Sequence, residues 1–229
     1  MNKWINDILN LFFPLKCHIC GTTLSPNEQF VCSSCIEALP RTGYHRNKDN
    51  PMEARFAGHF PFVAATGHFF YSKDSSLAQL IQDMKYRNFP SIGVMLGKLA
   101  GKELYMSGFL NEIDVIVPLP MHFLKKASRG YNQADKIAEG ISLATGLPVI
   151  DALRMRHRRK SQTYLSGTER LKNAVDLFST KKSIDLSGKS ILLIDDICTT
   201  GATMEGAALA LIKGFRDIKL YLFTIGVTF

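Results

Sequence analysis

The sequence predicts an α/β fold in which a parallel sheet is flanked by helices and preceded by a small module with four cysteines. From residue 114 onward, apolar runs of strand length alternate with helical patterns, and strands that alternate with helices form parallel sheets covered on both faces. Four of the five cysteines stand near the N-terminus as two Cys-x-x-Cys pairs. With 229 residues, the chain is long enough for one well-packed domain and a small appendage.

Residues 1–17 are expected to form a short amphipathic helix that docks on the body of the protein. Apolar side chains recur there at helical spacing, namely Trp4, Ile5, Ile8, Leu9 and Phe12. Polar residues interrupt the apolar run and no small-residue cleavage site follows, which argues against a signal peptide. Binding to a membrane surface is the alternative interpretation. No stretch approaches the length of a transmembrane helix, so we expect a cytoplasmic protein without a transmembrane segment.

The two cysteine pairs predict a structural zinc site. Eleven residues separate the pairs, and such knuckles can direct four thiolates at one tetrahedral ion; the ligands would be Cys17, Cys20, Cys32 and Cys35. Disulfides are the alternative, but a chain without an export signal should meet reducing conditions. The zinc would fold a module, residues 1–45 with the N-terminal helix, that is too small to build its own core. A second role in nucleic-acid binding stays open, and His18 is expected to be a spectator.

Polar and turn-forming residues over 40–59 predict a linker, which we place at 46–58, with the main domain over 59–229. Two short strands are expected around Thr66 and Gly67, and helical spacing of apolar residues follows. The expected helices cover 76–88, 91–106, 131–146 and 203–214, and the expected strands of the parallel sheet cover 114–120, 191–197 and 219–227. Gly146 and Gly214 are expected to close two of the helices.

The segment "DDICTTGAT" predicts a site for a sugar phosphate. Asp195 and Asp196 follow an apolar strand, where a pentose diol could donate hydrogen bonds to them or a divalent cation could sit nearby. The turn that follows leads into a helix whose free N–H groups suit a phosphate; its residues include Thr199, Thr200, Gly201 and Thr203. Response-regulator receivers also carry paired acids at a strand end, but near the N-terminus and without this turn. Helix capping would account for one hydroxyl and not three.

Positive charge favours anionic partners. The chain has 28 Lys and Arg against 20 Asp and Glu, a formal net charge of +8. Five cations stand in the segment "RMRHRRK", which could form a strip that binds phosphate or DNA. The residues of that strip would be Arg156, Arg158, Arg159 and Lys160. A solvated basic loop is an equally good interpretation.

The segment "LLIDDICTTGAT" resembles the phosphoribosyl-pyrophosphate (PRPP) motif of type I phosphoribosyltransferases. Other segments narrow the resemblance to the ComF/GntX-like family, which is associated with DNA uptake in natural competence. They are the four-cysteine module, "MKY" (84–86), "VPLP" followed by "RGYNQ" (129–133), and "SQTYLSGTERLKNAVDLF" (161–178). The resemblance covers nearly the whole chain and implies a type I phosphoribosyltransferase-like domain with a zinc module.

By this resemblance, Asp195 and Asp196 would be catalytic residues that hold the ribose 2- and 3-hydroxyls, directly or around Mg²⁺. The 5-phosphate would lie in the turn made of Thr199, Thr200, Gly201, Ala202 and Thr203. The turn of Pro118, Leu119 and Pro120 would carry backbone donors for the pyrophosphate, with Arg129 as its counter-charge and as a catalytic residue. Lys85 would be a further residue that binds PRPP, although it could instead complement a helix dipole. Residues Gln162 to Arg170 would form the mobile loop over the reacting carbon.

Two functions follow from the resemblance and the charge. The first is a PRPP-binding protein of this family that acts in DNA uptake, with magnesium-dependent phosphoribosyl transfer to an acceptor that the sequence does not identify. Such enzymes displace pyrophosphate from the anomeric carbon, mostly by positioning and charge stabilisation. The alternative is a non-catalytic component of the competence machinery that binds single-stranded DNA with the same fold. The expected partners are PRPP or another phosphorylated ribose, single-stranded DNA and other DNA-uptake proteins.

Overall fold

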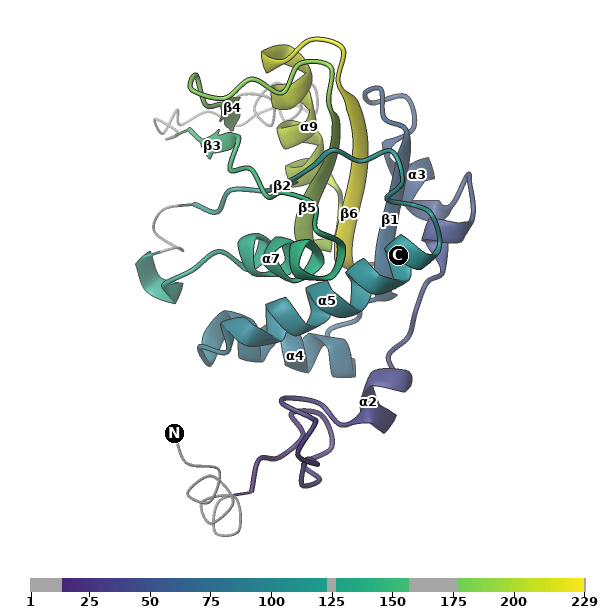
Figure 1. The fold of residues 1–229 in the computed structure, drawn as a ribbon, viewed down its shortest axis with the longest axis vertical. Coiled ribbons are helices and arrows are strands. Elements are labelled where there is room, and N and C mark those ends of the chain that lie inside the picture. Colours follow the sequence, from purple (N-terminus) through teal and green to yellow (C-terminus); the bar gives the residue numbers. More distant parts are fainter. Residues whose placement is uncertain (1–13, 123–126, 157–176, 229) are drawn as a thin grey trace, which may run out of the picture.

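The fold is a parallel sheet with helices on both faces (Figure 1), as the sequence predicts. The computed structural model describes residues 14–122, 127–156 and 177–228, so most of the expected N-terminal helix lies outside the described residues. The sheet has four strands in the order β1–β6–β5–β2, all parallel. They are β1 (Ala64–Phe70), β2 (Val115–Pro118), β5 (Ser190–Cys198) and β6 (Lys219–Val227).

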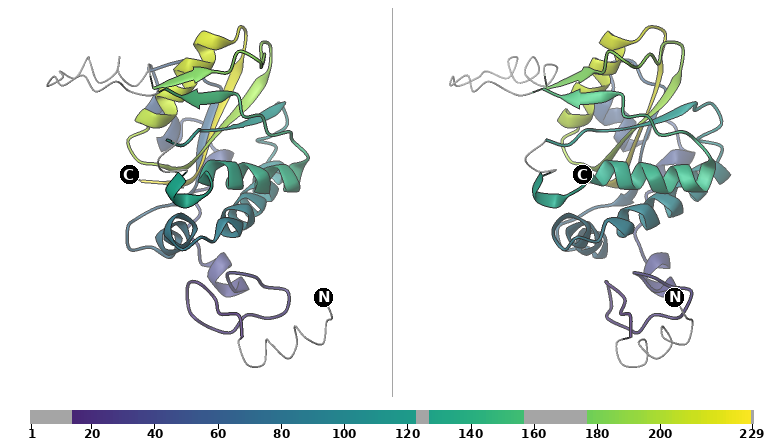
Figure 2. Two further views of the ribbon diagram at one scale, coloured as in Figure 1. Left: turned by 90° about the vertical axis from the view of Figure 1, so that its left-hand side faces the viewer. Right: turned by 60° about the vertical axis from the view of Figure 1, so that its left-hand side comes forward.

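Helices cover both faces of the sheet (Figure 2), and a hydrophobic core lies on each face. Successive side chains of a strand point to opposite faces, so in β5 Leu192 and Ile194 belong to one core and Ile191 and Leu193 to the other. The first core is covered by α4 (Ser76–Tyr86), α5 (Pro90–Met106) and α7 (Gln133–Thr145). The second is covered by α3 (Pro51–Phe56) and α9 (Ala202–Gly214). None of the described helices is long and apolar enough to cross a lipid bilayer.

The expectation of two strands around Thr66 and Gly67 is wrong, because the single strand β1 runs through both residues. Gly67 serves close packing and not a turn. A Cβ atom at this position would lie 2.6 Å from the Cβ of Val227, which is closer than two carbon atoms can approach.

The prediction of a linker over 46–58 is also wrong where the chain forms α3. Asn50 caps this helix, with its Oδ1 accepting from the N–H groups of Met52 (3.0 Å) and Glu53 (3.2 Å). Met52 and Phe56 are fully buried in the core beneath α9. A short 3₁₀ helix, η1 (Tyr44–Arg46), precedes α3. A polar, proline-containing segment therefore contributes two large core side chains.

A second, two-stranded antiparallel sheet joins β3 (Leu153–Met155) to β4 (Phe178–Thr180). This sheet is not predictable from the sequence, because strands of three residues carry too little periodicity. The cysteine module (residues 14–38), which includes α2 (Ser33–Glu37), lies beside α4 on the side away from the sheet (Figure 1).

Candidate functional site

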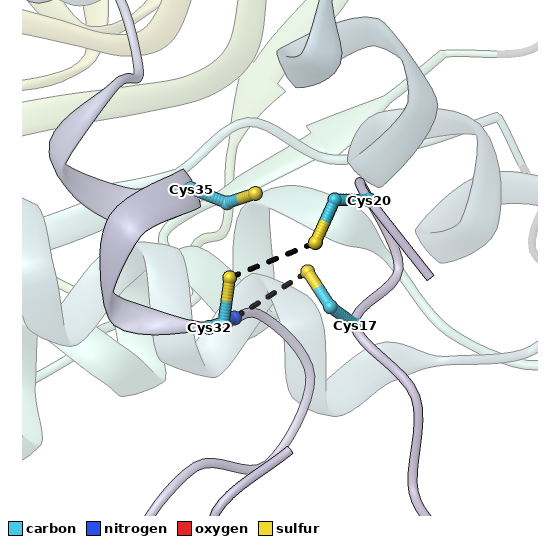
Figure 3. A group of neighbouring side chains, drawn as sticks. All are labelled: Cys17, Cys20, Cys32 and Cys35. Carbon is cyan, nitrogen blue, oxygen red and sulfur yellow. Dashed lines mark hydrogen bonds between the residues drawn. The ribbon is translucent and has the colours of Figure 1, made fainter. Parts of the chain in front are cut away.

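The four cysteines of the module form a candidate metal centre. Figure 3 shows their side chains pointing toward one another from α2 and from the loop before it. All four sulfur atoms lie within 4.8 Å of one another, and the Sγ atoms of Cys20 and Cys32 are 3.8 Å apart. Four sulfurs bound tetrahedrally to zinc at about 2.3 Å are roughly 3.8 Å apart. The N–H groups of Ile19 and Cys32 each lie 3.4 Å from the Sγ of Cys17, which favours a thiolate there. The cluster could therefore hold a metal ion such as zinc.

The paired acids of β5 face different surroundings. Since neighbouring residues of a strand point to opposite faces, Asp196 reaches α4 and makes an ion pair with Lys85. Asp195 instead lines a small cavity with the loop that follows the strand. Its Oδ1 accepts a hydrogen bond from the backbone N–H of Asp196 at 2.8 Å. Among the residues that the structure describes, Asp196 is therefore paired with a cation and Asp195 is not.

Asp195 holds its proton more tightly than an ordinary carboxyl group. Burial, and then the negative charge of Asp196, raise its pKa to about 8, while the Asp196 N–H and Lys85 lower it by less. A cation or a hydroxyl donor beside Asp195 would favour its ionised form. The carboxyl group is thus suited to accept hydrogen bonds from a polyol or to meet a cation.

The loop after β5 surrounds the cavity next to Asp195. This partly open cavity has a volume of about 30 Å³ and is lined by the residues from Ile197 to Met204, together with Asp195 and Thr224 of β6. The cavity lies at the start of α9, whose first N–H groups have no partners within the helix. Thr199, Thr200 and Thr203 are exposed here, and the Thr200 hydroxyl oxygen lies 3.5 Å from the N–H of Ala202. A phosphate group has the charge and the acceptors that such a loop can bind.

Gly201 and α3 fix the shape of this loop. Gly201 is the N-cap of α9 and has a φ of 85°, a conformation that favours glycine. The ring of Phe56 packs directly beneath it, 2.7 Å from where a Cβ atom would lie. Arg55 donates to the carbonyl oxygens of Cys198, at 3.4 Å, and of Thr228. Arg55 and Thr224 were not predicted from the sequence, because Arg55 lies in the expected linker and Thr224 is an ordinary residue for a strand.

The turn of residues 118–120 cannot supply the backbone donors expected of it. Pro118 and Pro120 have no N–H group, and the N–H of Leu119 donates to the carbonyl oxygen of Ile194 at 2.8 Å. The carbonyl oxygen of Leu119 accepts from Asn132 at 2.8 Å. The expectation is therefore wrong, because the one available donor continues the pairing of β2 with β5.

Arg129 lies against the C-terminal end of α4, on the residue that follows Lys85. The guanidinium of Arg129 lies over the ring of Tyr86, 5.2 Å from its centre, and donates to Gln133 Oε1 at 3.1 Å. Tyr131 donates to the carbonyl oxygen of Met84. The segment "RGYNQ" and the segment "MKY" are thus neighbours in space, and Lys85 of the second segment makes the ion pair with Asp196.

Other predicted residues stay apart from this site or lie outside the described residues. Five of them lie outside the described residues, namely Arg158, Arg159, Lys160, Gln162 and Arg170. Arg156 is exposed and its N–H donates to the carbonyl oxygen of Leu177 at 2.7 Å.

Comparison with known proteins identifies the family. The model of the family described as "Phosphoribosyl transferase domain" matches residues 94–220, more than half of the chain. Competence protein ComFC from Streptococcus pneumoniae is 36% identical, over 90% of this chain and 98% of that protein. The chain belongs to the ComF-type family of phosphoribosyltransferase-domain proteins. This ComF-type chain is also 27% identical to competence protein F from Haemophilus influenzae, over 92% of this chain and 96% of that protein.

Further relatives have related names. The DNA utilization protein YhgH from Salmonella typhi is 25% identical to this ComF-type protein, over 92% of this chain and 97% of that one. Among solved structures, adenine phosphoribosyltransferase from Saccharomyces cerevisiae is 18% identical, over 62% of this chain and 72% of that chain, with a TM-score of 0.38. The family match and the parallel sheet together confirm the predicted fold class.

Proposed function

We propose that the chain binds PRPP or another ribose 5-phosphate at the C-terminal ends of β5 and β2, and that it acts in DNA uptake. The observation that carries the proposal is the cavity that Asp195 shares with the loop at the start of α9. A pentose 5-phosphate carries hydroxyls and a phosphate a few bonds apart, which matches carboxylate acceptors beside a loop of N–H and hydroxyl donors. The names of the relatives, which refer to competence and DNA utilization, support the cellular role.

Each residue has a proposed part in binding. Asp195 and Asp196 accept hydrogen bonds from the ribose hydroxyls, and Lys85 leaves or shares Asp196 when the ligand arrives. The loop Thr199–Thr203 holds the 5-phosphate. Arg129 balances the charge of the pyrophosphate, whose backbone donors must come from residues after Pro120. The segment Gln162–Arg170 closes over the ligand. We keep the assignment of residues 1–45 to the module and of residues 59–229 to the ligand-binding domain as part of this proposal, with α3 added to that domain because it packs into the same core.

Calorimetry with PRPP and Mg²⁺ tests the binding site. The variant carrying Asp195→Asn and Asp196→Asn keeps the shape of both side chains and removes both carboxyl groups. We expect it to lose all measurable binding. Asp151→Asn is the matched control, since it removes a carboxylate that pairs with Lys181 at 2.5 Å and does not line the cavity. Equal affinity of the double variant and the control would refute the proposed site.

We further propose phosphoribosyl transfer at this site. A nucleophilic acceptor atom forms a bond to the anomeric carbon, the bond from that carbon to pyrophosphate breaks, and the acceptor gives up a proton. The chain would contribute orientation of the ribose and charge stabilisation of the leaving group. Release of pyrophosphate from PRPP, measured across a panel of nucleobases and other nitrogen acceptors, tests this step. A wild-type protein that binds PRPP and releases no pyrophosphate with any acceptor would favour a binding role without catalysis.

Two metals belong to the proposal. Zn²⁺ fits the cysteine cluster, because four sulfur donors in a tetrahedral arrangement suit it best among common divalent ions. Mg²⁺ prefers oxygen ligands, and the carboxylates of Asp195 and Asp196 supply the hard donors it would need. When bound with PRPP, Mg²⁺ would neutralise charge on the pyrophosphate.

Single-stranded DNA binding is the second candidate function, and the net charge of +8 favours it. The proposed contact is the strip of Arg156, Arg158, Arg159 and Lys160. Affinity for a labelled oligonucleotide should fall steeply as salt rises, and the slope for single strands is about 0.7 per phosphate neutralised.

The triple variant Arg156→Ala, Arg158→Ala and Arg159→Ala tests the strip by fluorescence anisotropy at several salt concentrations. We expect weaker binding and a salt slope smaller by about 2, because three contacts are lost. The control variant replaces Lys181, Lys182 and Lys189 with alanine and so removes the same charge elsewhere. Identical titrations for the two variants would exclude the strip as the DNA contact.

A further inference from the structure

The last turn of α4 connects the cysteine module with the candidate ligand site. His18 stands between Cys17 and Cys20, and its Nδ1 lies 2.6 Å from Oδ2 of Asp83. Asp83 belongs to α4 and is only 2% exposed. A buried carboxylate is costly unless hydrogen-bonded partners compensate for the lost water. His18 is such a partner, and the module supplies it.

His18 is held in place by several contacts besides this one. The side-chain amide of Gln79, also on α4, donates to the His18 carbonyl oxygen. The imidazole packs edge-on against Phe89 and Phe30, with ring centres 4.7 and 5.9 Å apart. Phe89 in turn donates its N–H to the carbonyl oxygen of Asp83 at 3.4 Å. The first cysteine pair and the end of α4 therefore form one packed contact, and His18 is not a spectator.

The same helical turn carries residues of the candidate ligand site. Lys85, two residues after Asp83, makes the ion pair with Asp196. Met84 accepts from Tyr131, and Tyr86 lies beneath Arg129. Consecutive residues of an α-helix are joined rigidly by their backbone hydrogen bonds. A displacement at Asp83 must therefore move Lys85 relative to Asp196.

We propose that His18 is a positioning residue for the phosphoribosyl site. By binding Asp83, it fixes the last turn of α4 and so places Lys85 against Asp196, although His18 touches no ligand. The cysteine cluster keeps His18 in place, so the metal in the module and the ligand in the domain are coupled. Coupling of this kind is reciprocal, and bound ligand should slow the loss of metal from the cysteines. The effect on ligand affinity rests on the proposed function, whereas the ordering of α4 does not.

Three variants test the contact. His18→Phe removes the hydrogen-bond donor and keeps an aromatic ring against Phe89. His18→Asn keeps a side-chain N–H close to the position of Nδ1 and should restore the contact. Asp83→Leu removes the acceptor from the α4 side and leaves every residue of the module unchanged. Arg87→Ala is the control, because Arg87 also pairs with Asp83, at 3.1 Å, but its side chain is 71% exposed and such pairs contribute little.

Three measurements are made on each full-length variant: metal content, hydrogen exchange and calorimetry with PRPP. The informative amides are those of Arg87 and Phe89, which both donate to the Asp83 carbonyl oxygen. We expect His18→Phe and Asp83→Leu to keep one metal ion, to exchange these amides about fivefold faster or more, and to bind PRPP more weakly by a similar factor. His18→Asn and Arg87→Ala should remain close to wild type.

The outcomes separate this inference from the proposed function. Wild-type exchange at both amides in Asp83→Leu, or in metal-loaded His18→Phe, overturns the inference. If the amides of Arg87 and Phe89 exchange as fast in His18→Asn as in His18→Phe, the inference is overturned as well. If the wild-type protein binds no PRPP, the proposed function fails, and hydrogen exchange alone decides whether His18 orders α4.

Discussion

Gly201 is required by both its backbone conformation and its packing. Its φ of 85° favours glycine, and a Cβ atom would lie 2.7 Å from Cε1 of Phe56. We expect Gly201→Ala to lower the free energy of unfolding by about 2–4 kcal/mol, as the sum of left-handed backbone strain and overpacking. Thermal unfolding measures the loss. Gly188→Ala is the control, because Gly188 has a φ of 74° but nothing within 4 Å of its Cβ position. Equal losses would contradict the packing argument.

Asp195 makes the stability of the fold depend on pH. Burial and the charge of Asp196 raise its pKa from 3.8 to about 8. Between these two values the folded chain keeps a proton that the unfolded chain releases. The contribution of this group to the free energy of unfolding is therefore fully present below pH 3.8, and it is lost as pH rises toward about 8. The neutral variant Asp195→Asn should therefore gain stability over wild type from pH 5 to pH 8.

Melting curves of wild type and Asp195→Asn across this range measure the gain. Asp151→Asn, which removes an exposed carboxylate, controls for the loss of one charge. A difference between Asp195→Asn and wild type that stays constant from pH 5 to pH 8 would contradict a raised pKa.

Helices α5 and α7 cross with their backbones in contact. A Cβ atom on Gly97 would lie 2.2 Å from the carbonyl oxygen of Ile137, and one on Gly140 would lie 2.2 Å from that of Val94. Backbone atoms cannot move aside as the ends of side chains can, so Gly97→Ala must push the helices apart. We expect a loss of about 1–3 kcal/mol, although alanine favours the helix itself by about 1 kcal/mol. Denaturant unfolding measures it.

Gly101→Ala tests the same contact at a looser position. Its Cβ would lie 3.1 Å from Cα of Ile141, so small shifts can accommodate it and the loss should be smaller than for Gly97→Ala. The reverse order would mean that the crossing of α5 and α7 is not set by these glycines. Because α7 begins just after Arg129, this crossing also affects the candidate site.

Long helices and core strands were predictable because their signals are local. The apolar spacing of α4 and α5 and the Gly146 cap of α7, which has a φ of 79°, all appear as expected. The helix α3 was not predictable in this way, because its burial depends on the loop at Gly201, far away in the chain. In the cysteine pairs, ligand type and spacing are likewise a local signal.

At the scale of the whole molecule, the cysteine module and the sheet differ in what stabilises them. Among residues 14–38 only Cys17, Leu24 and Val31 are buried, whereas both faces of the sheet carry extensive cores. Removing the metal with a strong chelator under reducing conditions should therefore unfold the module and leave the sheet folded.

Hydrogen exchange across the chain measures this difference. After chelation, amides of residues 15–38 should lose their protection while those of β5 and β6 keep it, and added zinc should restore the first set. A module that stays protected without metal would show that its contact with α4 suffices to fold it.

The sequence by itself determined the α/β class, the four-cysteine cluster, and the loop that leads from Asp195 and Asp196 to the start of a helix. Each of these depends on neighbouring residues or on a short spacing. Only the tertiary structure decided how those parts are used. Pairing of β2 with β5 consumes the Leu119 N–H, Lys85 occupies Asp196 while Asp195 faces the cavity, and His18 reaches Asp83. Burial and the choice of hydrogen-bond partner depend on segments distant in the chain, and no local pattern records which donor or charge remains free once they meet.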